Sequence, residues 1–366
     1  MRMFFVAGIG IAVFLEFLLL TKKNKSDSDR ILTLWMFVII IHQFLLFVFI
    51  TEDVLRFPFL LGLEHPLPLL QGVFLYLYVC FLTNQLPEQK KLLLLHFVPA
   101  VLMYLYLIPF LALPADAKIA VYRGRGAGYE VFMMLKSYAV AISGIFYVTW
   151  SALLLRRHRI NIRDQFSDLD KVNLQWLRIL TYGMGGIWLL VIFFRDQTLI
   201  LAGVVIFVFL IGFFGIRQAE IFTTAPLPAD DDAPRKKYPK SGLTEEASGK
   251  LHQSLTHLMT EEALYRKSDL SINDLASKLG VHPNYLSQII NQKEEKNFYD
   301  FVNTYRFEEF KKLIAMEKNR QYTLLSLARD CGFSSKSSFN RYFKKATGQT
   351  PSEYSSGLSK NQIKPE

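Results

Sequence analysis

The stretch FSSKSSFNRYFKKATGQTPSEY, Phe333 to Tyr354, decides the fold of the C-terminal part of the chain. Phe339 and Phe343 stand four positions apart and therefore share one face of a helix, whereas hydroxyl, amide and basic side chains take the opposite face. Gly348 suits the end of that helix, because glycine adopts the left-handed cap conformation without strain. The pattern predicts an amphipathic helix with a polar, basic outer face.

A second copy of this pattern lies earlier in the chain. LASKLGVHPNYLSQII, Leu275 to Ile290, aligns with LARDCGFSSKSSFNRYF, Leu327 to Phe343: both read Leu, Ala, three residues and Gly, followed by a polar helix start and apolar residues four apart. This is the layout of a helix-turn-helix. Between the copies, Phe298 to Glu317 can form one helix of about 30 Å, close to the roughly 34 Å between successive major-groove faces of B-DNA. The sequence predicts two helix-turn-helix units on one side of a duplex.

Helix-capping residues mark the ends of these short helices. Ser271 and Asp274 fit a capping box, and so do Thr350 and Glu353 with a proline at the first helical position. Proline also suits the first turn of the helix that carries Leu286, and glycines stand where helices should stop. The prolines at helix starts are Pro283 and Pro351, and the glycines at helix ends are Gly280, Gly332 and Gly348.

Residues 250–356 resemble the DNA-binding domain of the AraC/XylS-type transcription regulators, in which a long helix joins two helix-turn-helix units. The second unit carries the most specific part of the resemblance, and Tyr285, Leu286, Asn291, Phe298, Asn303 and Arg306 extend it into the first. Ser355 replaces an arginine that is common in the family and contacts phosphate. The matching positions are Ala328, Gly332, Phe333, Phe339, Arg341, Phe343, Lys344, Gly348, Thr350, Pro351, Glu353 and Tyr354.

Double-stranded DNA is the expected partner of the polar faces opposite the apolar residues of each unit. Arg pairs bidentately with guanine and Asn with adenine, whereas Lys suits phosphate. The face of the first unit is uncharged, so we expect base-edge or shape readout there, and we expect Arg306 to link the long helix to its neighbours. The predicted DNA-binding residues are Pro283, Asn284, Tyr285, Ser287, Gln288 and Asn291, and Ser335, Lys336, Ser337, Asn340, Arg341, Lys344 and Lys345.

The N-terminal part of the chain is far more apolar than the C-terminal part. Seven apolar runs are each long enough to cross a hydrocarbon core with about 20 helical residues. The first has a basic end and no small-residue cleavage site, which favours a retained span over a signal peptide. The predicted runs are 3–20, 31–50, 66–83, 92–113, 131–155, 176–194 and 198–216.

The distribution of Lys and Arg predicts the orientation of these spans, because short cytoplasmic loops carry the excess positive charge. The N-terminus is therefore expected outside and the C-terminal region in the cytoplasm, at the inner membrane. Arg2, Arg56, Lys118, Arg123, Arg125 and Arg195 lie on the expected outer side. Lys22, Lys23, Lys25, Arg30, Lys90, Lys91, Arg156, Arg157, Arg159, Arg163 and Lys171 lie on the cytoplasmic side.

Polar residues inside apolar spans are candidates for function, because they are costly there. His42, Gln43 and Gln71 are the predicted sensor residues; Glu16 and Lys136 lie closer to the expected interfaces, where long side chains reach water. Cys80 and Cys331 are the two cysteines of the chain, too few for a disulfide framework or a cysteine zinc site. We expect no metal, no cofactor and no enzymatic activity.

The sequence therefore predicts an all-α protein with three parts: a seven-helix transmembrane module (1–216), a disordered linker rich in Pro and Asp (217–243), and an AraC-type DNA-binding domain (244–366). The predicted function is a membrane-anchored, sequence-specific transcription regulator whose spans sense a signal. The alternative is a receptor or transporter whose tail docks protein partners. A small-molecule or envelope signal, a homodimer, an activator role and proteolytic release of the tail all stay open.

Overall fold

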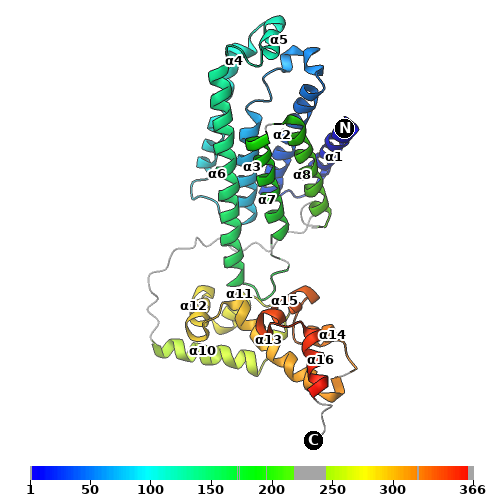
Figure 1. Cartoon of the computed structure of the whole chain (residues 1–366). Helices are drawn as coiled ribbons and strands as arrows, with labels where there is room; N and C mark the ends of the chain where they lie inside the picture. Colours follow the sequence, from blue (N-terminus) through cyan, green and yellow to red (C-terminus); the bar gives the residue numbers. More distant parts are fainter. Residues whose placement is uncertain are drawn as a thin grey trace. The chain divides into compact units, whose positions relative to one another are not determined.

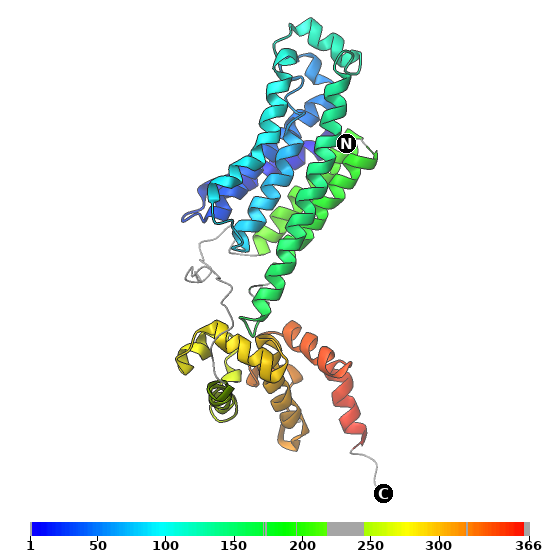
Figure 2. The ribbon, with the colours of Figure 1, turned by 90° about the vertical axis from the view of Figure 1, so that its left-hand side faces the viewer.

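The computed structural model describes residues 2–170, 172, 174–194, 196–217, 245–319 and 321–361. Within these residues the regular structure is helical, apart from an isolated antiparallel β-bridge between Phe166 and Ser271 (Figures 1 and 2). The described residues of Met1–Arg156 and Leu174–Asp232 form a first compact unit, and those of Arg157–Asn173 and Ala233–Glu366 form a second. The predicted all-α class is confirmed.

The first unit is a bundle of long apolar helices. Its α-helices are α1 (Arg2–Thr21), α2 (Asp27–Ile50), α3 (Leu67–Leu82), α4 (Val98–Leu111), α5 (Ala115–Arg123), α6 (Glu130–Arg163), α7 (Gln175–Leu189) and α8 (Gln197–Arg217). Short 3-10 segments η1 (Asp53–Leu55), η2 (Pro58–Leu60) and η3 (Lys90–Phe97) and a π-helical turn η4 (Leu190–Phe194) complete it. Helix α6 runs beyond the predicted residue 155, and its last turns belong to the second unit.

All seven predicted apolar runs are helical. Six stretches are long and apolar enough to cross a membrane: Arg2–Thr21, Asp27–Ile50, Lys90–Leu111, Glu130–Arg163, Gln175–Phe194 and Gln197–Gly215. The seventh, α3, has only 16 residues, fewer than the about 20 that a straight span needs. Every residue from Gly72 to Cys80 is buried, so α3 is an interior helix of the bundle, and such a helix is apolar on all sides.

The second unit consists of short helices around one longer one. The order is α10 (Glu245–Thr260), η5 (Leu264–Arg266), α11 (Ile272–Leu279), α12 (Pro283–Glu294), α13 (Phe298–Ala315), η6 (Glu317–Asn319), α14 (Leu324–Asp330), α15 (Lys336–Thr347) and α16 (Pro351–Asn361). Helices α11 and α12 form the first helix-turn-helix, and α14 and α15 form the second. Apart from Arg217, which ends α8, the predicted linker 217–243 lies outside the described residues.

Helix α13 is shared by two apolar cores. Phe298, Phe301 and Val302 pack with the first helix-turn-helix, whereas Phe307 and Phe310 pack with the second. The helix ends two residues before the predicted Glu317, because Met316 takes an extended conformation with ψ 125°. Its 18 residues correspond to about 27 Å. The predicted long spacer helix is confirmed, and both helix-turn-helix units pack against it.

Candidate nucleic-acid interface

The first helix-turn-helix has the predicted caps. The Ser271 hydroxyl and the Asp274 carboxylate bond reciprocally to each other's backbone amides and begin α11. Gly280 ends α11 with φ 65°, and Pro283 occupies the first turn of α12. The His282 side chain caps α12 by accepting a hydrogen bond from the Asn284 amide. These contacts fix the angle at which α12 leaves the turn.

Helix α12 separates an apolar face from a polar one. Leu286, Ile289 and Ile290 are buried, and Leu286 and Ile290 belong to the core of the first helix-turn-helix. Of the predicted DNA-binding residues, Asn284, Gln288 and Asn291 are exposed and recur at helical spacing, whereas Pro283, Tyr285 and Ser287 are half-buried. The polar stripe therefore runs along the length of the helix.

The second helix-turn-helix repeats this arrangement with more positive charge. The Ser335 hydroxyl accepts a hydrogen bond from the Ser338 amide and begins α15, and Gly348 ends the helix with φ 75°. Phe339 and Phe343 are buried, as expected. The exposed face carries Lys336, Ser337, Asn340, Arg341, Lys344 and Lys345, and Ser335 is half-buried.

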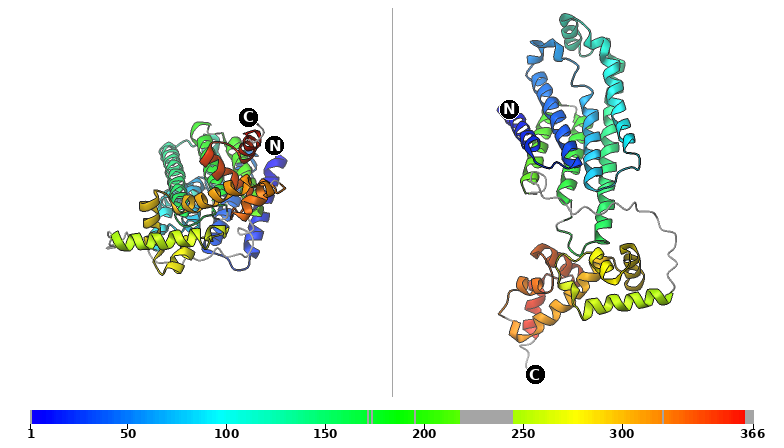
Figure 3. Two further views of the ribbon diagram at one scale, coloured as in Figure 1. Left: turned by 90° about the horizontal axis from the view of Figure 1, so that it is seen from below. Right: turned by 180° about the vertical axis from the view of Figure 1, so that it is seen from behind.

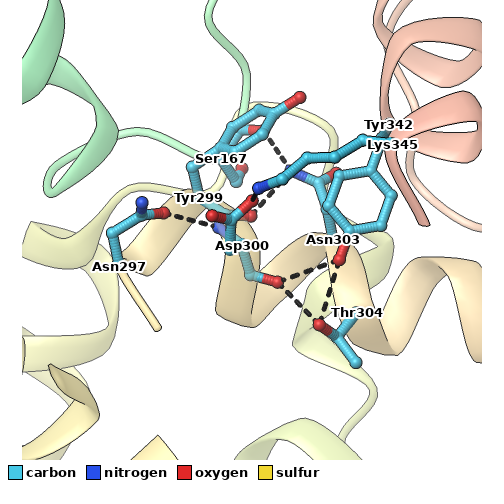
Figure 4. A network of polar contacts seen from close by, with 8 residues as sticks. All are labelled: Ser167, Asn297, Tyr299, Asp300, Asn303, Thr304, Tyr342 and Lys345. Carbon is cyan, nitrogen blue, oxygen red and sulfur yellow. Dashed lines mark hydrogen bonds and ion pairs between the residues drawn. The ribbon is translucent and has the colours of Figure 1, made fainter. Parts of the chain in front are cut away.

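Figure 4 shows how α15 is fixed onto α13. The Tyr342 hydroxyl lies 3.0 Å from the Thr304 hydroxyl and donates to the Asp300 carbonyl oxygen at 3.3 Å. The Lys345 ammonium bonds to the Asp300 carboxylate at 2.6 Å. Burial raises the pKa of the Tyr342 phenol, which keeps it a hydrogen-bond donor. Lys345 thus has a role in positioning the helix that its sequence context does not reveal.

The expected role of Arg306 in linking the long helix to its neighbours is confirmed. Its side chain is 1% exposed and donates to the carbonyl oxygens of Tyr265 and Lys267, each at 2.7 Å. It also donates to Asn303 Oδ1 at 3.2 Å and to Ser167 Oγ at 3.1 Å. Burial lowers the pKa of Arg306 to about 10, so the guanidinium keeps its charge at neutral pH. It is an internal brace.

Sequence reasoning missed three side chains that bond to residues of the second unit: the buried Ser167, and Asp170 and Asp300. Asp170 accepts hydrogen bonds from Ser335 Oγ and Arg341 Nη2, although it lies 165 and 171 residues away from them along the chain. No local pattern signals a pairing of that separation. On each helix only part of the predicted set is exposed, and two predicted residues, Ser335 and Arg341, are already engaged by this carboxylate.

The predicted sensor residues all lie in the first unit. Gln71 on α3 accepts a hydrogen bond from Trp35 Nε1 on α2 at 2.8 Å, which gives it a structural partner. Gln43 on α2 is 0% exposed, and neither of its side-chain polar atoms has a hydrogen-bond partner among the residues that the structure describes. His42 is also buried. Among the described residues, no cluster of three or more His, Cys, Asp or Glu side chains is arranged to hold a metal ion.

The family model described as a helix-turn-helix domain matches residues 275–357, which include α12, α13, α14 and α15. The chain carries an AraC-type helix-turn-helix domain. That domain begins on α11 and ends within α16, so it contains both polar faces and the long helix between them.

Curated relatives are similar to this AraC-type domain. An uncharacterized HTH-type transcriptional regulator of Staphylococcus aureus (strain COL) is 34% identical over 91 residues, 25% of this chain and 12% of the relative. The regulator YtdP of Bacillus subtilis is 27% identical over 104 residues, 28% of this chain and 13% of its own length. YijO of Escherichia coli is 32% identical over 87 residues, 24% of this chain and 30% of its own length.

These relatives are themselves named as uncharacterized HTH-type transcriptional regulators. The chain spans about an eighth of the length of the first two. No solved structure matches the chain.

Proposed function

We propose that the chain is a membrane-embedded transcription regulator that binds double-stranded DNA through α12 and α15. The observation that carries this proposal is the pair of helix-turn-helix units on one spacer helix, each presenting an exposed polar face. Figure 1 and the right-hand view of Figure 3 place α12 and α15 along one edge of the second unit. Recognition helices on a common edge can enter one face of a duplex in consecutive major grooves.

The two helices have different chemical roles in this proposal. On α15, Arg341 can pair bidentately with guanine and Asn340 with adenine, while Lys344 neutralises phosphate. On α12, the exposed side chains Asn284 and Gln288 are uncharged, which suits base edges or groove shape. Most of the salt-dependent affinity is therefore expected from α15 and the specificity from both helices.

The apolar helices of the first unit supply the membrane anchor in this proposal. The distribution of Lys and Arg favours an external N-terminus and a cytoplasmic AraC-type domain at the inner membrane, an arrangement in which α3 crosses the membrane as a seventh span beside the six candidate spans. His42 and Gln43 are buried polar residues in a candidate span, and the side-chain amide of Gln43, which has no hydrogen-bond partner within the described part of the chain, supports a sensing role for this helix. A signal can shift the protein between two states only if it binds them unequally.

The DNA-binding part is tested with the full chain in phosphatidylcholine nanodiscs and fluorescent 40-base-pair duplexes of random sequence. Because Lys344 is expected to neutralise one phosphate, Lys344→Ala should weaken binding and reduce the slope of log affinity against log salt by about 1. Lys250→Ala, on α10 outside the two helix-turn-helix units, also removes one positive charge and should leave that slope unchanged. Binding that is absent, or independent of salt, would favour the alternative of a protein-docking tail.

The sensing part needs a separate measurement. Transcription from a target promoter is compared between the full chain and a version in which the spans are replaced by a single inert anchor. Residues 157–173 are kept in that version, since they belong to the second unit. Unchanged regulation would reject a sensory role for the first unit while leaving the DNA-binding proposal intact.

A further inference from the structure

The chain between α6 and α7 is built into the second unit. Its backbone pairs with the residues that precede α11: the Ser167 amide donates to the Leu270 carbonyl oxygen at 3.1 Å, and the Ile272 amide donates to that of Gln165 at 2.9 Å. These two bonds flank the antiparallel bridge between Phe166 and Ser271. The segment of residues 157–173, here called the clasp, includes the last turns of α6, and its described residues pair with the second unit through this one β-bridge.

Buried side chains hold the clasp in this register. Ile162 and Leu169 belong to the same apolar core as Phe307 and Phe339. Ser167 is 0% exposed, and its hydroxyl donates to the Leu270 carbonyl oxygen at 2.6 Å. Figure 4 shows Ser167 beside Asn303, whose amide donates to the Ser167 carbonyl oxygen at 3.1 Å. The clasp is therefore a packed part of the domain.

This packing places the Asp170 carboxylate at the start of α15. The Asp168 carboxylate accepts a hydrogen bond from the Asp170 amide at 3.0 Å, which fixes the turn that carries Asp170. Asp170 then accepts hydrogen bonds from the Ser335 hydroxyl and the Arg341 guanidinium. An anion is favoured at this end of a helix, because unpaired backbone amides give it partial positive charge.

Ser335 and Arg341, which bond to Asp170, are also predicted DNA-binding residues. In helix-turn-helix proteins the N-terminal residues of the recognition helix contact base edges. Arg341 donates to Asp170 through Nη2, so part of its charge and one of its five N–H donors are engaged, and a guanine or phosphate has to compete with Asp170 for this guanidinium. The Arg341 and Asp170 side chains are 45% and 28% exposed, so this ion pair is open to competition from a nucleic acid.

We propose that the clasp is an internal inhibitor of DNA binding, in which Asp170 occupies Arg341 and Ser335 in place of DNA. This inference rests on the proposed DNA-binding function. The clasp is covalently continuous with α6 and is followed by α7, two helices that include candidate membrane spans. A movement of either helix that displaces the clasp moves Asp170 away from α15 and frees Arg341. A signal that moves the spans thereby reaches the recognition helix.

The test uses the full chain in phosphatidylcholine nanodiscs, with random-sequence 40-base-pair duplexes as the probe. Asp170→Asn keeps the shape of the side chain and removes its charge. Glu262→Gln is the matched control, because it removes one exposed carboxylate that pairs with Lys278, away from α15. Asp170→Asn should strengthen DNA binding by about fivefold, the order expected for release of one partly exposed ion pair, whereas Glu262→Gln should change it less than twofold.

A double-mutant cycle shows whether the gain passes through Arg341. If Asp170 acts by holding this guanidinium, the fivefold gain should disappear in the Arg341→Ala background. The inference is overturned if Asp170→Asn weakens binding, if it matches Glu262→Gln, or if the gain persists without Arg341. Wild-type binding that is salt-dependent but unaffected by Asp170→Asn rejects the inhibitor alone. Absence of DNA binding in every variant rejects the proposed function as well.

Discussion

The turn of the second helix-turn-helix is expected to be far less tolerant of a methyl group than the turn of the first. Gly280 and Gly332 occupy corresponding positions and both have positive φ, 65° and 99°. A Cβ atom on Gly280 would have no atom of the described residues within 4 Å. On Gly332 it would lie 2.4 Å from the Tyr265 carbonyl oxygen and 2.9 Å from Arg266 Cα. The close approach is to backbone, which cannot rotate away.

The two alanine substitutions therefore differ in free energy of unfolding. A left-handed conformation costs a non-glycine residue about 1–2 kcal/mol, which is the whole expected cost of Gly280→Ala. Gly332→Ala adds the overpacking of η5 against the turn, about 1–3 kcal/mol more. We expect a total loss of about 2–5 kcal/mol for Gly332→Ala. Since marginal stabilities are about 5–15 kcal/mol, the higher value would remove between about a third and all of the free energy of unfolding of the second unit.

Pulse proteolysis of the full chain in nanodiscs, at increasing urea, measures this difference from the loss of the intact second unit. The first unit serves as an internal reference, because neither substitution touches it. Equal urea midpoints for Gly280→Ala and Gly332→Ala would refute the reasoning, as they would mean that backbone conformation alone decides the cost and that the contact with Tyr265 is relieved freely.

Three further results are expected from the same assay. Arg306→Ala should cost about 3–5 kcal/mol, because it leaves a cavity and several buried carbonyl oxygens without a donor; a loss below 1 kcal/mol would contradict its bracing role. Leu169→Ala should destabilise the second unit by about 2–4 kcal/mol, although it lies far outside residues 275–357. Burial alone would raise the pKa of Asp274, but hydrogen bonds from Ser271 and the charge of Lys267 hold it below its ordinary value. The stability from this depressed pKa is present above the unfolded value of about 3.9 and is lost as pH falls through the folded value. Asp274→Asn should therefore be less stable than wild type at pH 7, and the gap should begin to narrow as the pH falls below about 4.

Short-range chemistry made most of the second unit predictable from sequence. Leu286 with Ile290, and Phe339 with Phe343, identify the buried faces because helical periodicity depends only on residues four apart. The caps at Ser271 and Gly348 are equally local, since each satisfies backbone groups within its own turn. In the same way, apolar composition alone indicated the candidate spans.

Tertiary structure decided which polar groups meet. The sequence by itself determined that Arg341 stands on the exposed face of a basic helix, but not that Asp170, 171 residues earlier, bonds to its guanidinium. Nor did it determine that α3, as apolar as its neighbours, lies inside the bundle, or that the chain between α6 and α7 contributes Leu169 to the core of the AraC-type domain. Periodicity and capping act over single helical turns and leave a record in the sequence. Ion pairs and shared cores form between segments that only the folded chain brings together, so their partners carry no local signal.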